Sequence, residues 1–273
     1  GYLDPDLEGK WVGWLTVNPQ VSHAVKHRNV TIVVDCSGSM GGISNQQARV
    51  AVREIVENLT PDDTFNIVRF GSDATALFPE AMPGSDKDKT KALHLIADMD
   101  ADMGGTEIGA ALELAYTCAK GMREPGDILL ITDGQSYDVE SVIHNAERSG
   151  CRHFTIGVGT AVAEDMVEGL ARATGGAHEY VSPNENMAEA IVRHVKRGYA
   201  ARLSNSQITW PIKPEQSIPN IITHAFSGDT LNLFARFDSR PEGDAVVRLE
   251  FGGEVWSQRI PLRAYSDATA DST

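Results

Sequence analysis

Apolar residues follow two alternating patterns over residues 30–199. Short continuous runs, such as VTIVV at residues 30–34 and DILLIT at residues 127–132, are typical of strands buried on both faces of a parallel sheet. Between such runs, apolar residues recur three and four positions apart, as on one face of an amphipathic helix. This alternation predicts an α/β domain built on a doubly wound, mostly parallel sheet that is covered on both faces.

The same patterns place the individual elements. The predicted strands cover residues 30–34, 64–70, 127–132, 153–158 and 178–181, with a short antiparallel edge strand over residues 74–78. Helices are expected over residues 86–99, 107–122, 139–148, 164–173 and 186–199. The first helix is predicted to begin with Ser44 as N-cap and Gln47 three residues on, which together form a capping box.

The pattern changes after residue 200. Apolar and polar residues now alternate over residues 206–210, 221–226, 230–237, 245–251 and 255–262, between Pro and Gly residues. This predicts a small antiparallel β-sandwich module, which we expect residues 10–17 to join as a further strand. The α/β domain would then be inserted into the β module. The predicted parts are 1–25 (N-terminal strand of the β module), 26–199 (α/β domain), 200–265 (β module) and 266–273 (disordered tail).

Oxygen-bearing side chains follow the buried strands. Asp35, Ser37 and Ser39 come after the first strand, Asp133 follows residues 127–132, and Thr106 follows Gly-Gly at the start of a helix. Ligands of a doubly wound sheet lie outside the carboxyl ends of its strands, and hard oxygen atoms suit a small hard cation. The alternative is ordinary turn and helix-cap chemistry, which favours the same residue types.

The net charge and the lengths of the apolar runs exclude some classes of binding partner. The chain has 273 residues, a formal net charge of -14 and no run rich in Lys or Arg, so nucleic acid and anionic membranes are not expected to bind it. No apolar run approaches the roughly 20 residues of a membrane span, and we expect no direct membrane insertion. Because the chain begins at Gly1, we expect it to be part of a longer polypeptide or complex.

The three cysteines, Cys36, Cys118 and Cys151, have no CxxC spacing. This argues against a disulfide scaffold or a zinc site and favours small buried apolar side chains. A redox role for Cys36, which lies among the acidic and hydroxyl residues, is the alternative. Unpaired cysteines slightly favour a reducing, intracellular compartment. Three cysteines do not decide the location, and both a cytoplasmic and a secreted or cell-surface location stay open.

The order D-x-S-x-S, then Gly-Gly-Thr, then Thr-Asp-Gly resembles the von Willebrand factor type A (VWA) domain with its metal-ion-dependent adhesion site, or MIDAS. The resemblance covers residues 30–199 and implies a Rossmann-like fold. It implies that Ser37 and Ser39 bind the cation directly through their hydroxyls. Asp35 is implied to act directly or, often, through water, Thr106 directly or through water, and Asp133 usually through water. Such a site is implied to leave one coordination position open for a partner's Asp or Glu.

The wider sequence resembles one branch of this family, the inter-alpha-trypsin inhibitor heavy chains. This rests on D-x-F-N-I-V-x-F at residues 63–70, Gly157-Val158-Gly159, Thr174-Gly175-Gly176 and F-x-G-D-x-L at residues 226–231. The domain is inserted into a β-sandwich in that branch. Relatives often carry a small or aliphatic residue where this chain has Cys36.

We therefore expect a non-catalytic binding module in which a divalent cation captures an acidic side chain of a protein partner. The oxygen-only ligands suit Mg²⁺, with Mn²⁺ or Ca²⁺ as substitutes. One alternative is a metal-dependent hydrolase that uses the same cation to activate water. The other is a structural scaffold subunit of a larger complex, in which the cation only stabilises the fold.

Overall fold

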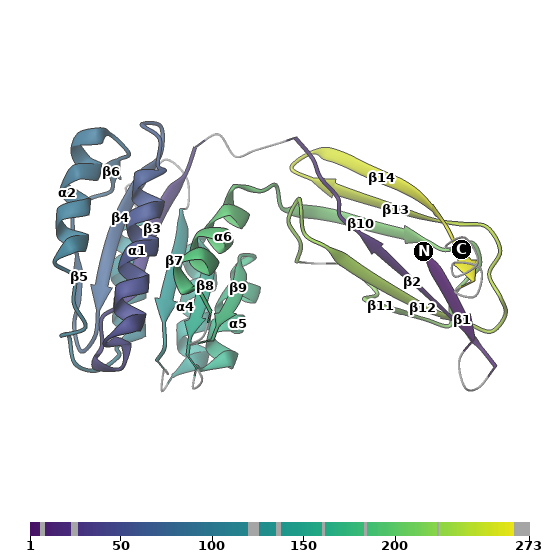
Figure 1. The fold of residues 1–273 in the computed structure, drawn as a ribbon, viewed down its shortest axis with the longest axis horizontal. Coiled ribbons are helices and arrows are strands. Elements are labelled where there is room, and N and C mark those ends of the chain that lie inside the picture. Colours follow the sequence, from purple (N-terminus) through teal and green to yellow (C-terminus); the bar gives the residue numbers. More distant parts are fainter. Residues whose placement is uncertain are drawn as a thin grey trace. The chain divides into compact units, whose positions relative to one another are not determined.

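The computed structural model describes residues 1–5, 9–22, 27–119, 126–134, 138–159, 162–182, 185–222 and 224–264. The chain divides into two compact units (Figure 1). One unit comprises Gly1–Ala24 with Ala200–Thr273, and the other comprises Val25–Tyr199. The predicted tail, residues 266–273, lies outside the described residues.

The central sheet of Val25–Tyr199 is mixed and mostly parallel, which confirms the predicted α/β class. Its strands are β3 (Asn29–Asp35), β4 (Thr64–Phe70), β5 (Ala74–Ala76), β6 (Met82–Pro83), β7 (Asp127–Thr132), β8 (Arg152–Val158) and β9 (Ala177–Val181). They are ordered β5-β4-β3-β7-β8-β9, and β6 pairs with β4 off this path. Only β5 and β6 run antiparallel to their neighbour among the described strands.

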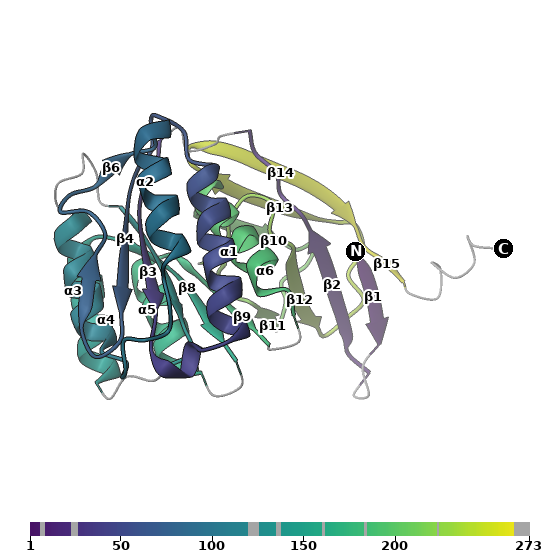
Figure 2. The same cartoon turned by 60° about the vertical axis from the view of Figure 1, so that its left-hand side comes forward.

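Helices cover both faces of this sheet. They are α1 (Ile43–Glu57), α2 (Asp86–Ala97), α3 (Ile108–Ala119), α4 (Val139–Ser149), α5 (Glu164–Thr174) and α6 (Met187–Tyr199). Figure 2 shows α1, α2 and α6 on one side of the sheet. The helices α3, α4 and α5 pack on the opposite side. None of the helices among the described residues has the length and apolar character that a bilayer span needs.

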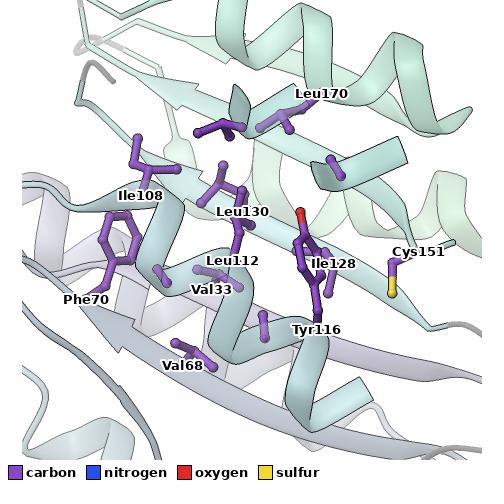
Figure 3. Packing of buried hydrophobic residues seen from close by; sticks show 14 of the residues in the cluster. Val33, Val68, Phe70, Ile108, Leu112, Tyr116, Ile128, Leu130, Cys151 and Leu170 are labelled. Atoms are coloured by element: carbon purple, nitrogen blue, oxygen red, sulfur yellow. The ribbon is translucent and has the colours of Figure 1, made fainter. Parts of the chain in front are cut away.

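The core under α3, α4 and α5 explains why the buried strands are continuously apolar. Val33, Val68 and Leu130 point from the sheet into one cluster with Ile108 and Leu112 of α3 (Figure 3). The intervening residues of β3, β4 and β7 are buried on the other face of the sheet. Because both faces are covered, apolar residues stand on both faces of these strands and fill most of their central positions.

Two details of the α/β unit differ from prediction. The α1 helix begins at Ile43 after Gly42, so the predicted capping box at Ser44 is wrong. The Gln47 side chain instead accepts a hydrogen bond from the backbone N–H of Met187, at 2.6 Å, and links α1 to α6. The edge strand predicted over residues 74–78 is shorter and covers Ala74–Ala76.

The other unit consists of two sheets. One has the order β11-β12-β2-β1-β15, and the second has the order β10-β13-β14. Buried residues of β2, β12, β10 and β13 share one hydrophobic cluster. The strand bounds are β1 (Tyr2–Pro5), β2 (Trp11–Val17), β10 (Leu203–Thr209), β11 (Gln216–Ile218), β12 (Leu231–Phe237), β13 (Asp244–Phe251), β14 (Glu254–Pro261) and β15 (Arg263–Ala264).

The N-terminal strand β2 pairs antiparallel with β12 from Trp11↔Phe237 to Val17↔Leu231. Residues 2–5, which lie before the strand predicted at residues 10–17, form β1 and pair with β2 and β15. The strand predicted over residues 221–226 is wrong. The described residues there form only an isolated bridge between Phe226 and Arg202, and the strand beside β12 is β11.

Candidate metal centre

The strand order reverses at β3. The chain passes from β3 to β4 on one side, and β7 lies on the other side. In doubly wound sheets ligands bind beside such a reversal, at the carboxyl ends of the strands, and we call this place at the ends of β3 and β7 the crevice. Asp35 is the last residue of β3 and Asp133 directly follows β7, so the topology brings these two predicted residues to the same crevice.

The loop after β3 is organised by the Asp35 carboxylate. Its Oδ1 accepts a hydrogen bond from the backbone N–H of Ser37 at 2.9 Å. A short 3-10 helix, η1 (Gly38–Met40), then places Ser39 next to Ser37. The two hydroxyl oxygens are 3.0 Å apart, and the Ser39 hydroxyl donates to Oδ1 of Asp133 at 2.9 Å. Ser37, Ser39 and Asp133 therefore form a continuous chain of oxygens across the crevice.

Thr106 reaches the crevice on a separate loop. Backbone hydrogen bonds fix this loop to the β3 loop, from Gly38 N–H to the carbonyl of Gly104 at 3.0 Å and from Met103 N–H to the carbonyl of Cys36 at 3.0 Å. The Thr106 side chain packs against Gly134, where an added Cβ would lie 2.4 Å from Thr106 Cγ2 and 3.3 Å from Asp35 Oδ2. All five predicted residues thus lie around one crevice. Thr106 takes part through packing against Gly134, and no hydrogen bond joins its hydroxyl to the other four among the described contacts.

Thr132 is a residue of this cluster that the sequence analysis did not single out. Its hydroxyl donates to Oδ2 of Asp35 at 2.6 Å and accepts from the backbone N–H of Gly134 at 3.0 Å. It therefore fixes the Asp35 carboxylate from the side opposite to Ser37. In the sequence, Thr132 only ends the apolar stretch ILLI, and the structure shows that it is 0% exposed.

The electrostatics of the crevice favour a bound cation. Burial raises the pKa of the Asp35 carboxyl, and hydrogen bonds from Ser37 and Thr132 partly oppose this rise. Burial also raises the pKa of Asp133, and the nearby Asp35 carboxylate adds to that rise. A cation between the two carboxyl groups would favour their ionised forms and offset their mutual repulsion.

The oxygen spacing fits a small octahedral ion. Metal–oxygen bonds of 2.0–2.1 Å place neighbouring ligand oxygens about 2.9 Å apart in an octahedron. The separations of 3.0 Å between Ser37 Oγ and Ser39 Oγ and 2.9 Å between Ser39 Oγ and Asp133 Oδ1 match that edge. The buried Asp35 and Ser37 form the floor, whereas Ser39 is exposed. An ion held here would have an open side toward solvent.

Other candidate groups do not form a second centre within the described part of the chain. No three His, Cys, Asp or Glu side chains gather there as a metal site. Asp100 instead accepts a hydrogen bond from Asn45 at 3.1 Å. The three cysteines are buried and free, as predicted, and burial raises the pKa of Cys36 to about 12. Its thiol is therefore protonated at neutral pH, which disfavours the redox alternative.

Sequence comparisons place the α/β unit among known proteins. Residues 29–194 match the family model of the von Willebrand factor type A domain. Human von Willebrand factor A domain-containing protein 5A is 28% identical over 256 residues, which cover 86% of this chain and 33% of that protein. A von Willebrand factor A domain-containing protein of Dictyostelium discoideum is 29% identical over 226 residues, 81% of this chain and 27% of that protein. The chain thus spans about a third or less of these relatives.

Solved structures show the same fold. A von Willebrand factor type A protein from Catenulispora acidiphila superposes with a TM-score of 0.60 at 15% identity, covering 94% of this chain and 74% of that one. Proximal thread matrix protein 1 from the mussel byssus gives a TM-score of 0.50 at 22% identity, covering 67% of this chain and 48% of that one. That mussel structure is described as having a zinc-occupied MIDAS motif.

Proposed function

We propose that this chain, which belongs to the von Willebrand factor type A domain family, is a metal-dependent protein-binding module. In this proposal Asp35, Ser37, Ser39, Thr106 and Asp133 hold a divalent cation, and an Asp or Glu side chain of a partner protein completes its coordination. Proteins of this family generally act as protein-interaction modules. The partner protein and its acidic residue are part of what we propose.

The observation that carries the proposal is the chain of oxygens from Ser37 through Ser39 to Asp133, with its octahedral edge lengths. Only two carboxylates contribute to the centre, and the remaining ligands are neutral hydroxyls. The two carboxylates balance the charge of a divalent cation overall, but in this proposal they act mainly through water while neutral hydroxyls bind directly, so the cation still attracts a further carboxylate. The exposed side at Ser39 leaves room for that group.

Mg²⁺ is the proposed ion because the ligands are all oxygens and the spacing fits bonds of 2.0–2.1 Å. Mn²⁺ or Ca²⁺ are the proposed substitutes. The zinc in the MIDAS motif of the mussel protein supports a divalent cation at this position of the fold. The finer assignment to the inter-alpha-trypsin inhibitor heavy chain branch stays part of the proposal and rests on the sequence motifs.

A binding role is favoured over a hydrolytic one. Metal-assisted hydrolysis usually needs a general base beside the activated water, and histidine is the commonest base. The described hydrogen bonds of the centre join hydroxyls, carboxylates and backbone groups, and none involves a histidine. The relatives are named only as domain-containing proteins, without an activity.

The test of the metal centre is Mg²⁺ titration by calorimetry of the wild type and of Ser39→Ala. The variant removes one oxygen of the chain, and we expect Mg²⁺ affinity to fall roughly 10- to 100-fold, the range seen when groups that support metal ligands are lost. Ser44→Ala is the matched control, because Ser44 lies in α1 outside the oxygen chain. Equal affinity of Ser39→Ala and wild type would refute the assignment.

The capture of a carboxylate is tested with acetate, the simplest probe of that chemistry. Titrating acetate into the Mg²⁺-loaded protein should shift the NMR signals of backbone amides around Ser37 and Gly134. The shifts should vanish when Mg²⁺ is removed by a chelator and in Ser39→Ala. Identical shifts with and without Mg²⁺ would show that the cation does not bind the carboxylate.

A further inference from the structure

A groove of about 250 Å³ runs between α3 and α4 and begins at Thr106. Its α3 side follows Ile108, Leu112 and Tyr116, which lie along one side of that helix in Figure 3. The α4 side of the groove is formed by Asp138, Ser141, Val142 and Asn145. One end of the groove therefore adjoins the candidate metal centre, because Thr106 belongs to both.

The floor and the rim of the groove differ in chemistry. Ile108, Leu112 and Val142 form an apolar floor and are 1%, 1% and 7% exposed. Three exposed carboxylates, Glu107, Glu113 and Asp138, stand on the rim. None of the described residues that line the groove is Lys or Arg. An apolar floor under a negative rim complements a side chain with an aliphatic stem and a cationic end.

Gly109 keeps the groove open. A Cβ added at Gly109 would make only ordinary contact, 3.7 Å from Val142 Cγ2. A methyl group would therefore fit between the helices at this point, and its absence widens the space beside Thr106. The helix accepts a glycine here although glycine is less favourable than alanine inside a helix.

We propose that this groove receives a Lys or Arg side chain of the same partner whose carboxylate binds the cation. This inference rests on the proposed function. The aliphatic stem would lie on the floor, and the cationic group would donate hydrogen bonds to the rim carboxylates. Arginine suits the site best, because its planar guanidinium can donate to two carboxylates at once.

The geometry also sets the spacing of the two partner residues. Glu113 lies seven residues beyond Thr106, which corresponds to about 10 Å along a helix. An extended peptide covers about 3.3 Å per residue, so the basic residue should stand about three positions from the acidic one. The recognised motif is therefore an acidic residue followed or preceded by a basic residue at this distance.

The probe is the synthetic peptide Gly-Asp-Gly-Gly-Arg-Gly, blocked at both ends, titrated into Mg²⁺-loaded protein and followed by NMR. Replacing its arginine with citrulline removes the charge and keeps the shape. We expect the citrulline peptide to bind about three- to tenfold more weakly, as fits an ion pair near the surface. Amide signals of Gly109, Leu112 and Asn145 should shift with the arginine peptide only.

Glu113→Gln should reduce the difference between the two peptides and leave Mg²⁺ affinity unchanged. Glu147→Gln is the matched control, since it makes the same change on α4 outside the groove lining. Gly109→Leu, which fills the groove, should abolish the difference. Equal affinity of the arginine and citrulline peptides for the wild type would overturn the groove proposal.

The design separates this proposal from the metal centre. If binding depends on Mg²⁺ but the arginine and citrulline peptides bind equally well, the proposed function stands and the groove proposal is wrong. A preference for arginine together with an affinity that neither a chelator nor asparagine in place of the peptide's aspartate lowers would support the groove and contradict capture of a carboxylate by the cation. Absence of any shift at millimolar peptide would count against both.

Discussion

At the scale of residues, the candidate centre depends on neutral hydroxyls more than on charge. Each Asp35 carboxylate oxygen accepts one hydrogen bond, from the Ser37 backbone N–H at 2.9 Å and from the Thr132 hydroxyl at 2.6 Å. Ser39 bridges the remaining distance to Asp133. Small displacements of these side chains should therefore weaken cation binding even when all five candidate ligands are present.

Gly134→Ala tests this dependence on position. The added Cβ would lie 2.4 Å from Thr106 Cγ2, so Thr106 or the loop after β7 must move. We expect Mg²⁺ affinity to fall about tenfold, together with a loss of about 1–3 kcal/mol in unfolding free energy from overpacking. Calorimetry and urea unfolding measure the two effects.

Gly38→Ala is the control, because a Cβ there has its nearest neighbour 4.0 Å away, at the carbonyl oxygen of Gly104. It should bind Mg²⁺ nearly as the wild type does. Wild-type affinity in Gly134→Ala would show that the position of Thr106 does not matter for the cation.

Sequence could locate the candidate residues but not their connections. Asp35, Ser37, Ser39 and Asp133 were predictable because each follows a strongly apolar strand. The support by Thr132 was not predictable, because a threonine inside a buried strand also fits ordinary β propensity. Its role depends on β3 and β7 being neighbours, a pairing between residues almost 100 positions apart.

At the scale of elements, the long amphipathic and buried segments were predictable, and the short ones were not. Strands β4 and β7 begin and end at the predicted residues, because continuous apolar runs bounded by polar residues are strong signals. Strands β1 and β11 have only 4 and 3 residues. Local patterns carry little information about such strands.

The contact between β8 and α3 predicts a dependence of stability on pH. His153 is 0% exposed, and its Nε2 lies 3.0 Å from the hydroxyl of Tyr116. Burial lowers the pKa of His153 to about 4, from an ordinary value near 6.5. Between these two values the unfolded chain binds the proton and the folded chain does not. The contribution of His153 is therefore complete above pH 6.5 and declines as the pH falls toward 4.

The measurement is urea unfolding of the wild type and of His153→Gln between pH 7.5 and pH 4.5, followed by circular dichroism at 222 nm. The stability advantage of the wild type should shrink below pH 6.5, by up to about 1.4 kcal/mol per pH unit. The difference in unfolding free energy between the two proteins at each pH cancels the contributions of the other titrating groups, which both proteins share. A difference that stays constant with pH would contradict the assigned shift.

At the scale of the whole molecule, two spectroscopic signals report the two units separately. The helices of the described residues all lie in Val25–Tyr199. The four tryptophans, Trp11, Trp14, Trp210 and Trp256, all belong to the other unit. Circular dichroism at 222 nm therefore follows the unit that carries the candidate centre, and tryptophan fluorescence follows the β-rich unit.

Mg²⁺ should raise the thermal midpoint of the circular dichroism transition. A ligand at 100 times its dissociation constant stabilises the folded state by about 2.7 kcal/mol, which corresponds to about 5–10 °C for a unit of this size. The fluorescence transition serves as an internal reference, and NaCl of matched ionic strength controls for screening. A midpoint that Mg²⁺ does not move beyond the NaCl control would contradict specific binding.

The acidic character of the molecule, with a formal net charge of -14, bears on the choice of partner. A carboxylate approaching the centre meets both the attraction of the cation and the repulsion of the surrounding charge. A basic residue beside the partner's carboxylate would reduce that repulsion, in agreement with the groove between α3 and α4. Binding of such a partner should weaken as salt increases.

The most direct test of the central claim is a crystal structure of the chain grown with Mn²⁺, with anomalous diffraction recorded to locate the ion. We predict an anomalous peak about 2.2 Å from Ser37 Oγ and Ser39 Oγ, close to Thr106 and Asp133, with a water or a carboxylate from another molecule at the open position. No peak in this crevice, or a peak only at other residues, would contradict the account.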